Sequence, residues 1–173
     1  MLERDYFPEN ARNLLKLLLA QDGSTTKLCE AITESRVELT IHHQTRLETV
    51  PEVVRHELGG TSWLKRITSL HSESRVLMDN LTFTRLDRVP EWFLADLEQG
   101  VAPVGYLLSK LFVRRERLNA TPELETQLFE IVRFADSSSS RAYTINTETG
   151  ALMLVFETYR AGLARAFGTK LDF

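Results

Sequence analysis

The sequence has little of several features that would narrow its function at once. Cys29 is the only cysteine, so no internal disulfide can form. No apolar run approaches the ~20 residues that a membrane-spanning helix needs, and the N-terminus lacks the basic-then-apolar pattern of a signal peptide. The net charge of -3 gives no reason to expect nucleic acid or an anionic membrane as a partner. We therefore expect a cytoplasmic protein.

Common catalytic and cofactor motifs are also missing. The chain contains no GxGxxG, GxxxxGK[ST], HExxH, CxxC or GxSxG sequence. His42 and His43 are adjacent in an expected strand, so their side chains point to opposite faces and cannot easily share a metal ion. We therefore do not expect a metal site.

The hydrophobic pattern predicts an α+β fold. The chain has 173 residues, of which 43% are hydrophobic, and this suits one compact domain over residues 1–173. Consecutive strands without intervening helices indicate an antiparallel sheet of about six strands, which we expect to carry its helices on one face. The periodicity predicts helices near 10–19, 24–32, 51–58, 91–98 and 104–111, and strands near 37–42, 63–70, 76–85, 112–118, 127–134, 141–145 and 151–160.

Glu157 lies in an unusual place for a carboxylate. In the run from Leu152 to Tyr159, both faces of the expected strand are apolar, which indicates a central strand that is covered on both sides. A carboxylate there is costly to ionise without a partner, and this suits a proton donor or a ligand-binding group. In the alternative interpretation, Glu157 lies at a frayed strand end and pairs with a surface arginine.

A second candidate group is the adjacent pair of cations Lys65 and Arg66. Their side chains must point to opposite faces of the expected strand, so one of them faces inward if the strand is covered. A buried cation needs an anion, which could be Glu157 or a carboxylate of a ligand. In the alternative interpretation, the strand end is exposed and both side chains reach water.

Taken in order along the chain, these pieces resemble the chorismate pyruvate-lyase family, and more closely its broader branch than the well-studied bacterial enzymes. The resemblance covers about Leu14 to Tyr159. It is carried by the order and spacing of five features: the Asp-Gly-Ser-Thr-Thr-Lys turn at 22–27, the Trp-Leu-Lys-Arg strand start at 63–66, Leu-Asp-Arg-Val-Pro at 86–90, Pro-Val-Gly at 103–105, and Glu157 in the last strand.

The resemblance implies an internal ligand cavity under two helical flaps and a carbon-oxygen lyase reaction. In that reaction chorismate loses pyruvate and becomes 4-hydroxybenzoate, without metal or cofactor. By position, Glu157 matches the catalytic glutamate, and the carboxylate-binding arginine of the family aligns with Lys65, or with Arg66 if the strand shifts by one residue. Thr25, Val104 and Gly105 fall at substrate-binding positions.

The same features allow a second function. The chain could be a non-catalytic module that binds a small aromatic carboxylate, related to the effector-binding domains of transcription regulators. In either case we expect a monomer or weak dimer that binds chorismate or a similar aromatic carboxylate.

Overall fold

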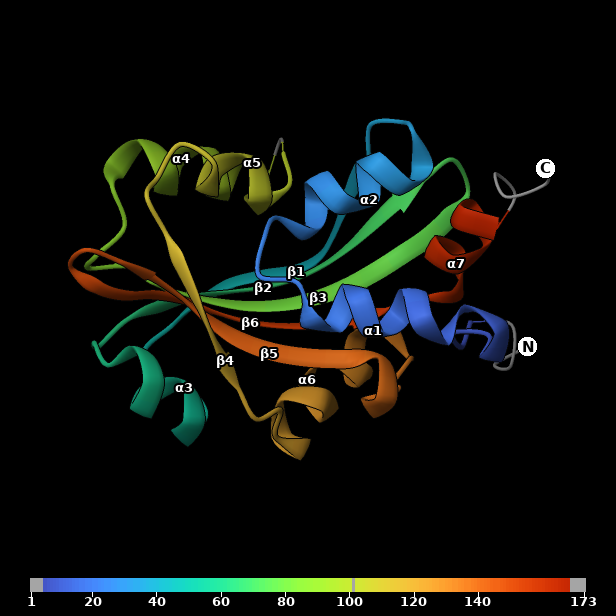
Figure 1. Cartoon of the computed structure of the whole chain (residues 1–173). Helices are drawn as coiled ribbons and strands as arrows, with labels where there is room; N and C mark the ends of the chain where they lie inside the picture. The colour runs from blue at the N-terminus through green and yellow to red at the C-terminus, as the bar shows by residue number, and fades with distance from the viewer. Residues whose placement is uncertain (1–4, 101, 169–173) are drawn as a thin grey trace.

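A six-stranded antiparallel sheet forms the centre of the protein (Figure 1). The computed structural model describes residues 5–100 and 102–168. Within them, the strands follow the spatial order β1-β2-β3-β6-β5-β4. Their bounds are β1 Glu38–Leu47, β2 Trp63–Ser72, β3 Arg75–Arg85, β4 Arg114–Leu118, β5 Ser140–Thr147 and β6 Gly150–Tyr159. The predicted α+β class with an antiparallel sheet is confirmed.

Helices connect and cover these strands. Their bounds are α1 Arg12–Ala20, α2 Thr25–Thr33, α3 Glu52–Leu58, α4 Glu91–Gln99, α5 Val104–Leu108, α6 Pro122–Val132 and α7 Ala161–Gly168, with short 3-10 turns η2 Glu9–Ala11 and η3 Ser137–Ser139. The helix α7 follows the last strand directly and was not predicted from the sequence. The helices α2, α3, α4 and α5 agree with prediction to within a few residues.

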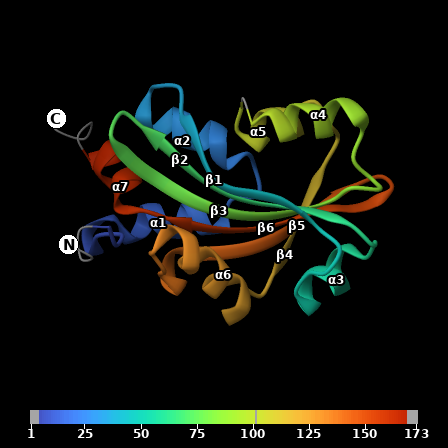
Figure 2. The same ribbon diagram turned by 180° about the vertical axis from the view of Figure 1, so that it is seen from behind.

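Both faces of the sheet are covered by helices, whereas the sequence led us to expect helices on one face. Figures 1 and 2 show α2, α4 and α5 on one side and α3 and α6 on the other. The buried side chains of α3 and α6 pack against Ile67, Leu81 and Phe83. The buried side chains of α4 and α5 pack instead against the opposite face, at Leu64 and Val155. The central strands are therefore apolar on both faces, and each face needs its own cover.

The predicted strand at 127–134 is wrong, because this segment belongs to α6. Thr121 caps the helix by accepting a hydrogen bond from the backbone N–H of Leu124, at 3.5 Å, and Pro122 takes the first helical position. Leu124 and Leu128 are one helical turn apart and both are buried. Residues Phe129 to Phe134 have a strand-like pattern on their own. They are helical nonetheless up to Val132, because the helix begins upstream at Thr121-Pro122.

One cap predicted from the sequence sets the position of α2 over the sheet. The Ser24 hydroxyl accepts a hydrogen bond from the backbone N–H of Lys27 at 3.4 Å, as the Gly-Ser turn indicates. The first turn of α2 is consequently fixed with Thr25 and Thr26 buried. These residues form part of the cavity described below.

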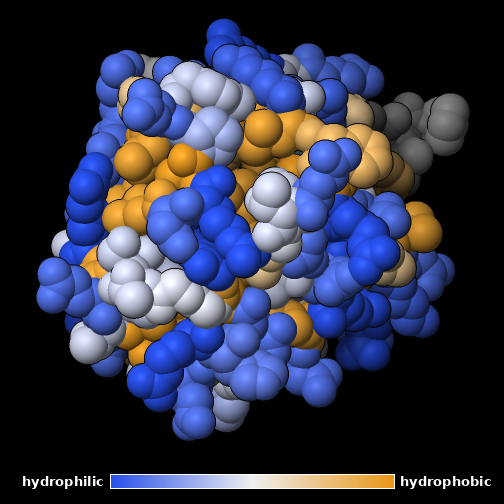
Figure 3. Space-filling view, turned by 90° about the vertical axis from the view of Figure 1, so that its left-hand side faces the viewer, coloured by the Kyte–Doolittle hydropathy of each residue, from blue (hydrophilic) through white to orange (hydrophobic). Residues whose placement is uncertain are grey.

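Part of the surface is apolar. Figure 3 shows hydrophobic residues in the upper half of the side that carries α4, between hydrophilic side chains. Phe112, Leu17 and Trp92 are among the large hydrophobic side chains that are exposed.

Among the described residues, no helix combines the length and the apolar character that crossing a membrane requires.

Close packing of α7 on the sheet provides a test of the fold. A Cβ atom on Gly162 would collide with the backbone carbonyl of Val76 in β3, whereas one on Gly168, in the same helix, would meet nothing within 4 Å. We expect Gly162→Ala to lower the free energy of unfolding by about 1–3 kcal/mol, measured by urea denaturation. Gly168→Ala is the control and should be neutral or slightly stabilising. Equal stability of the two variants would contradict this packing.

Candidate functional site

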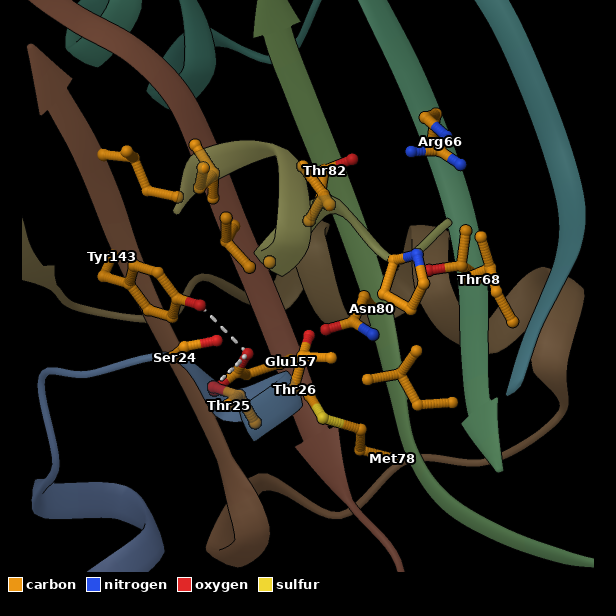
Figure 4. A pocket seen from close by; sticks show the side chains of 18 of the residues that line it. Ser24, Thr25, Thr26, Arg66, Thr68, Met78, Asn80, Thr82, Tyr143 and Glu157 are labelled. Carbon is orange, nitrogen blue, oxygen red and sulfur yellow. Dashed lines mark hydrogen bonds between the residues drawn. The ribbon is translucent and has the colours of Figure 1, made fainter. Parts of the chain in front are cut away.

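A cavity lies between the sheet and two helices, α2 and α5. It holds about 550 Å³ of space free of atoms, part of it open to solvent. The strands β2, β3, β6 and β5 form its floor, and the first turns of α2 and α5 lie over it (Figure 4). Its lining residues are Ser24, Thr25, Thr26, Leu39, Arg66, Thr68, Leu70, Met78, Asn80, Thr82, Pro103, Val104, Gly105, Leu108, Arg115, Tyr143, Ile145, Val155 and Glu157.

Strand register determines which side chains form the floor. Arg66 in β2 lies opposite Thr82 in β3, which lies opposite Val155 in β6, which in turn lies opposite Tyr143 in β5. Residues that are directly opposite in antiparallel strands point to the same face. This row therefore crosses the whole floor, and Glu157 belongs to the next row on the same face.

The cavity contains most of the residues that the sequence singled out. Thr25, Arg66, Val104, Gly105 and Glu157 all line it. They come from α2, β2, α5 and β6, so the antiparallel sheet brings together groups that are up to 132 residues apart in the chain. Whether they bind a ligand stays a prediction.

Of the two cations that the sequence offered, Lys65 does not line the cavity, contrary to the ungapped alignment with the family. Its neighbour Arg66 faces the cavity, so the alternation of β2 turns Lys65 to the opposite face. Burial lowers the pKa of Lys65, and Glu130 in α6 partly offsets this effect. Of the two candidate cations, Arg66 is therefore the one that faces the cavity.

Glu157 is buried but already well supplied with donors. Only 1% of its surface is exposed. Its Oε1 accepts hydrogen bonds from Nε of Arg141 at 2.6 Å, from the Tyr159 hydroxyl at 3.0 Å and from the Thr25 hydroxyl at 3.1 Å. Its Oε2 accepts one from the Tyr143 hydroxyl at 3.0 Å. Glu157 thus pairs with an arginine, as one interpretation held, but in the interior and not at a frayed end.

These partners of Glu157 were not predicted from the sequence. Arg141 and Tyr143 alternate with Ile145 on the cavity face of β5, and Tyr159 lies two residues after Glu157 on the same face of β6. The two-residue spacing of these side chains was the signal in the sequence that could have indicated them.

The charges of the cluster affect one another. Burial alone would lower the pKa of Arg141, but Glu157 and the two tyrosines raise it to above its ordinary value. Burial and the nearby Glu157 raise the pKa of Tyr143 and of Tyr159, so both hydroxyls keep their protons.

The other donors of Arg141 fix the end of α1 beside the cavity. Its Nη1 donates to the backbone carbonyl of Gln21, and its Nη2 donates to the Thr25 hydroxyl at 3.0 Å. From β4, Arg117 donates to the carbonyl of Leu19 at 2.8 Å. These cations satisfy the free carbonyls at the C-terminal end of α1 and suit its dipole. Every donor nitrogen of Arg141 consequently has a protein partner.

Arg66 contrasts with the other buried arginines. Among the described residues three arginines are less than 9% exposed, namely Arg66, Arg141 and Arg160. Arg141 pairs with Glu157, and Arg160 pairs with Asp79 at 2.6 Å. Arg66 is 2% exposed, and its Nε and Nη2 have no hydrogen-bond partner among the described residues. Burial lowers its pKa to about 10, so Arg66 remains charged at neutral pH.

The residue types around the cavity do not suit a metal ion. Arg66 and Arg115 would repel a cation, and the carboxylate of Glu157 is engaged by four protein donors. No group of three His, Cys, Asp or Glu side chains within residues 5–100 and 102–168 could hold a metal. The described residues thus form an α+β domain whose cavity is lined by a buried arginine with no anionic partner among them.

Comparison with known proteins assigns no family. No protein-family model matches the chain, and no curated protein matches it. Solved structures do match. PhnF from Mycobacterium smegmatis is 15% identical with a TM-score of 0.49, covering 88% of this chain and 80% of that one. The effector domain of PhnF is 16% identical, with a TM-score of 0.47 and coverages of 80% and 88%.

A third match has the same character. A GntR-family transcriptional regulator from Bacillus cereus is 16% identical with a TM-score of 0.45, covering 80% of this chain and 96% of that chain. At these identities and TM-scores, function has to be argued from the cavity itself.

The Glu157–Arg141 pair yields a prediction about stability. Glu157→Gln keeps the shape of the side chain but leaves Arg141 buried without an anion, which typically costs about 3–5 kcal/mol. We expect a loss of this size in the free energy of unfolding, measured by urea denaturation. The control is Glu116→Gln, which removes the partner of Arg114 in a surface pair and should change stability by less than about 1 kcal/mol. Similar losses in both variants would show that the buried pair contributes no more to the free energy of unfolding than the surface pair.

Proposed function

We propose that this domain binds a small molecule through a carboxylate, and that Arg66 is the residue that binds it. The observation that carries the proposal is the absence of a partner for Nε and Nη2 of Arg66 within the described part of the chain. A buried charge without an anion costs several kcal/mol, and unmade hydrogen bonds add to that cost. A ligand anion removes both penalties, which makes binding favourable.

The two unpaired nitrogens fit a carboxylate in particular. In a guanidinium group, Nε and Nη2 share one edge, and their N–H bonds point in parallel. A carboxylate presents two oxygens at a matching spacing, so the pair forms two parallel charge-assisted hydrogen bonds. This fork would be lost in a lysine, which binds as a point charge.

The remainder of the cavity suits an apolar body attached to the carboxylate. Side chains from all sides of the cavity contribute apolar surface, namely Leu39, Leu70, Met78, Val104, Leu108, Ile145 and Val155. Small-molecule sites commonly combine such walls with a few convergent polar groups. An aromatic carboxylate, the ligand class implied by the family resemblance, meets both requirements.

Binding without turnover is favoured over catalysis by the state of Glu157. A general acid or base must reach the reacting atom of the substrate through a free oxygen. Both oxygens of Glu157 already accept hydrogen bonds from protein donors, including the guanidinium of Arg141. We therefore infer that Glu157 orients Thr25 and Tyr143 and balances the charge of Arg141.

The lyase reaction stays as the second candidate, because Arg66 and Glu157 line the same cavity. In that case Arg66 would hold a carboxylate of chorismate, and Glu157 would assist the departing ether oxygen once substrate displaces one of its donors. Catalysis therefore requires that the substrate displace a donor of Glu157, whereas binding alone does not.

Arg66→Met tests the proposed function through stability and binding together. Removing a buried cation that lacks an anion should raise the free energy of unfolding of the ligand-free protein by about 1–3 kcal/mol, although most core substitutions lower it. We expect 4-hydroxybenzoate at 100 times its Kd to stabilise the wild type by about 2.7 kcal/mol and not to stabilise this variant.

Lys65→Met is the matched control, because it removes the adjacent cation on the opposite face. It should keep the response to 4-hydroxybenzoate. Loss of stability in ligand-free Arg66→Met, with an unchanged response to ligand, would contradict the proposal.

A coupled assay with lactate dehydrogenase separates the two candidate functions. We expect chorismate to stabilise the protein against heat without release of pyruvate above the rate in buffer. Pyruvate release that needs both Arg66 and Glu157 would instead establish the lyase reaction. Because Glu157→Gln is expected to lose stability, its assay should be run at a temperature where denaturation curves show it folded.

A further inference from the structure

Arg66 is one of four polar side chains that form a compact block on the cavity floor. In the register of β2 and β3, Arg66 lies opposite Thr82, and Thr68 lies opposite Asn80. All four side chains line the cavity (Figure 4). Arg66, Thr68 and Thr82 are buried, and Asn80 is half-buried. This chain therefore places a two-by-two polar block beneath a largely apolar enclosure.

The block differs from Glu157 and Tyr143 on the same floor, because its side chains make no hydrogen bonds to described residues. Among the described residues, the side chains of Thr68, Asn80 and Thr82 form no hydrogen bond, and two nitrogens of Arg66 also lack one. Across the same floor, Tyr143 and Glu157 are bonded to each other. Buried polar groups in native proteins nearly always have partners, so the buried and unpartnered Nε and Nη2 of Arg66 indicate where the polar part of a ligand binds. The side chains of Thr68, Asn80 and Thr82 have no competing partner among the described residues and lie beside them.

The chemistry of the block defines that polar part. Arg66 is its only charged member, so the ligand carries one anionic group there. Asn80 can both donate and accept hydrogen bonds, as can the threonine hydroxyls, so they suit an uncharged hydroxyl or keto oxygen. Directly opposite Cβ atoms in a sheet are about 4.5–5.5 Å apart, and diagonal neighbours are about 7–8 Å apart. The anionic group and the uncharged oxygen of the ligand must therefore be only a few covalent bonds apart.

We propose that the ligand is a 2-hydroxy or 2-oxo carboxylic acid with an apolar substituent. Arg66 and Thr82 bind the carboxylate, Thr68 and Asn80 bind the oxygen on the adjacent carbon, and the substituent occupies the apolar remainder of the cavity. The proposal rests on the proposed function, because it assumes that Arg66 binds a carboxylate. It goes further by assigning specificity to Thr68 and Asn80.

Four related acids test this assignment. Phenylacetate carries only the carboxylate, mandelate and phenylglyoxylate add an oxygen at the adjacent carbon, and 4-hydroxyphenylacetate adds a hydroxyl at the far end of the ring. We expect isothermal titration calorimetry to give a Kd for one mandelate enantiomer or for phenylglyoxylate at least tenfold below that of phenylacetate. 4-Hydroxyphenylacetate should gain no such advantage.

Substitution of the two assigned residues should remove the preference. In Asn80→Leu and Thr68→Val, the ratio of the phenylacetate Kd to the mandelate or phenylglyoxylate Kd should fall below two. Thr45→Val, on β1 and outside the cavity lining, is the control and should keep the wild-type ratio.

The outcomes separate this inference from the function beneath it. If phenylacetate binds in a manner that requires Arg66, but no 2-oxygen acid binds more tightly, then the assignment of Thr68 and Asn80 is overturned and the carboxylate site stands. Retention of the preference in both variants would have the same meaning. If none of the four acids binds, or if binding persists in Arg66→Met, both proposals are wrong.

Discussion

A guanidinium group that is buried without an anion is the constraint on which this account depends. Arg66 is as deeply buried as Arg141 and Arg160, yet only the latter two pair with carboxylates in the described part of the chain. Burial opposes the charge of Arg66, which is why its pKa falls to about 10. The fold tolerates this cost because the rest of the sheet is closely packed on both faces, and a bound anion would reverse it.

The antiparallel sheet explains how paired and unpaired cations come to lie side by side. Arg141 and Glu157 are directly opposite each other in β5 and β6, so strand register pairs them. Arg66 is separated from Glu157 by β3, where Asn80 and Thr82 supply no charge. At one end of the cavity Glu157 is therefore paired with Arg141, while the other end offers Arg66 and three uncharged hydrogen-bonding side chains. In the proposed function, this asymmetry sets the direction of the ligand.

Much of the fold was readable from the sequence, but the partners within the site were not. Local signals gave the Ser24 cap, the helix after Pro51 and the alternating strands. Alternation also showed that Lys65 and Arg66 face opposite ways, but not which one faces the cavity, because both faces of β2 are covered. The pairing of Glu157 with Arg141 depends on register between β5 and β6, which no local pattern specifies. The segment 127–134 was misread because its helix signal lies upstream, at Thr121-Pro122.

The central claim can be tested at the atom concerned, by NMR of the arginine Nε–H groups. The Arg66 signal is assigned by its absence in Arg66→Met, and the wild type is then titrated with 4-hydroxybenzoate. A carboxylate bound at the fork should move this signal downfield and slow its exchange with water, while the Arg141 signal changes little. An Arg66 signal that does not respond at saturating ligand would contradict the account.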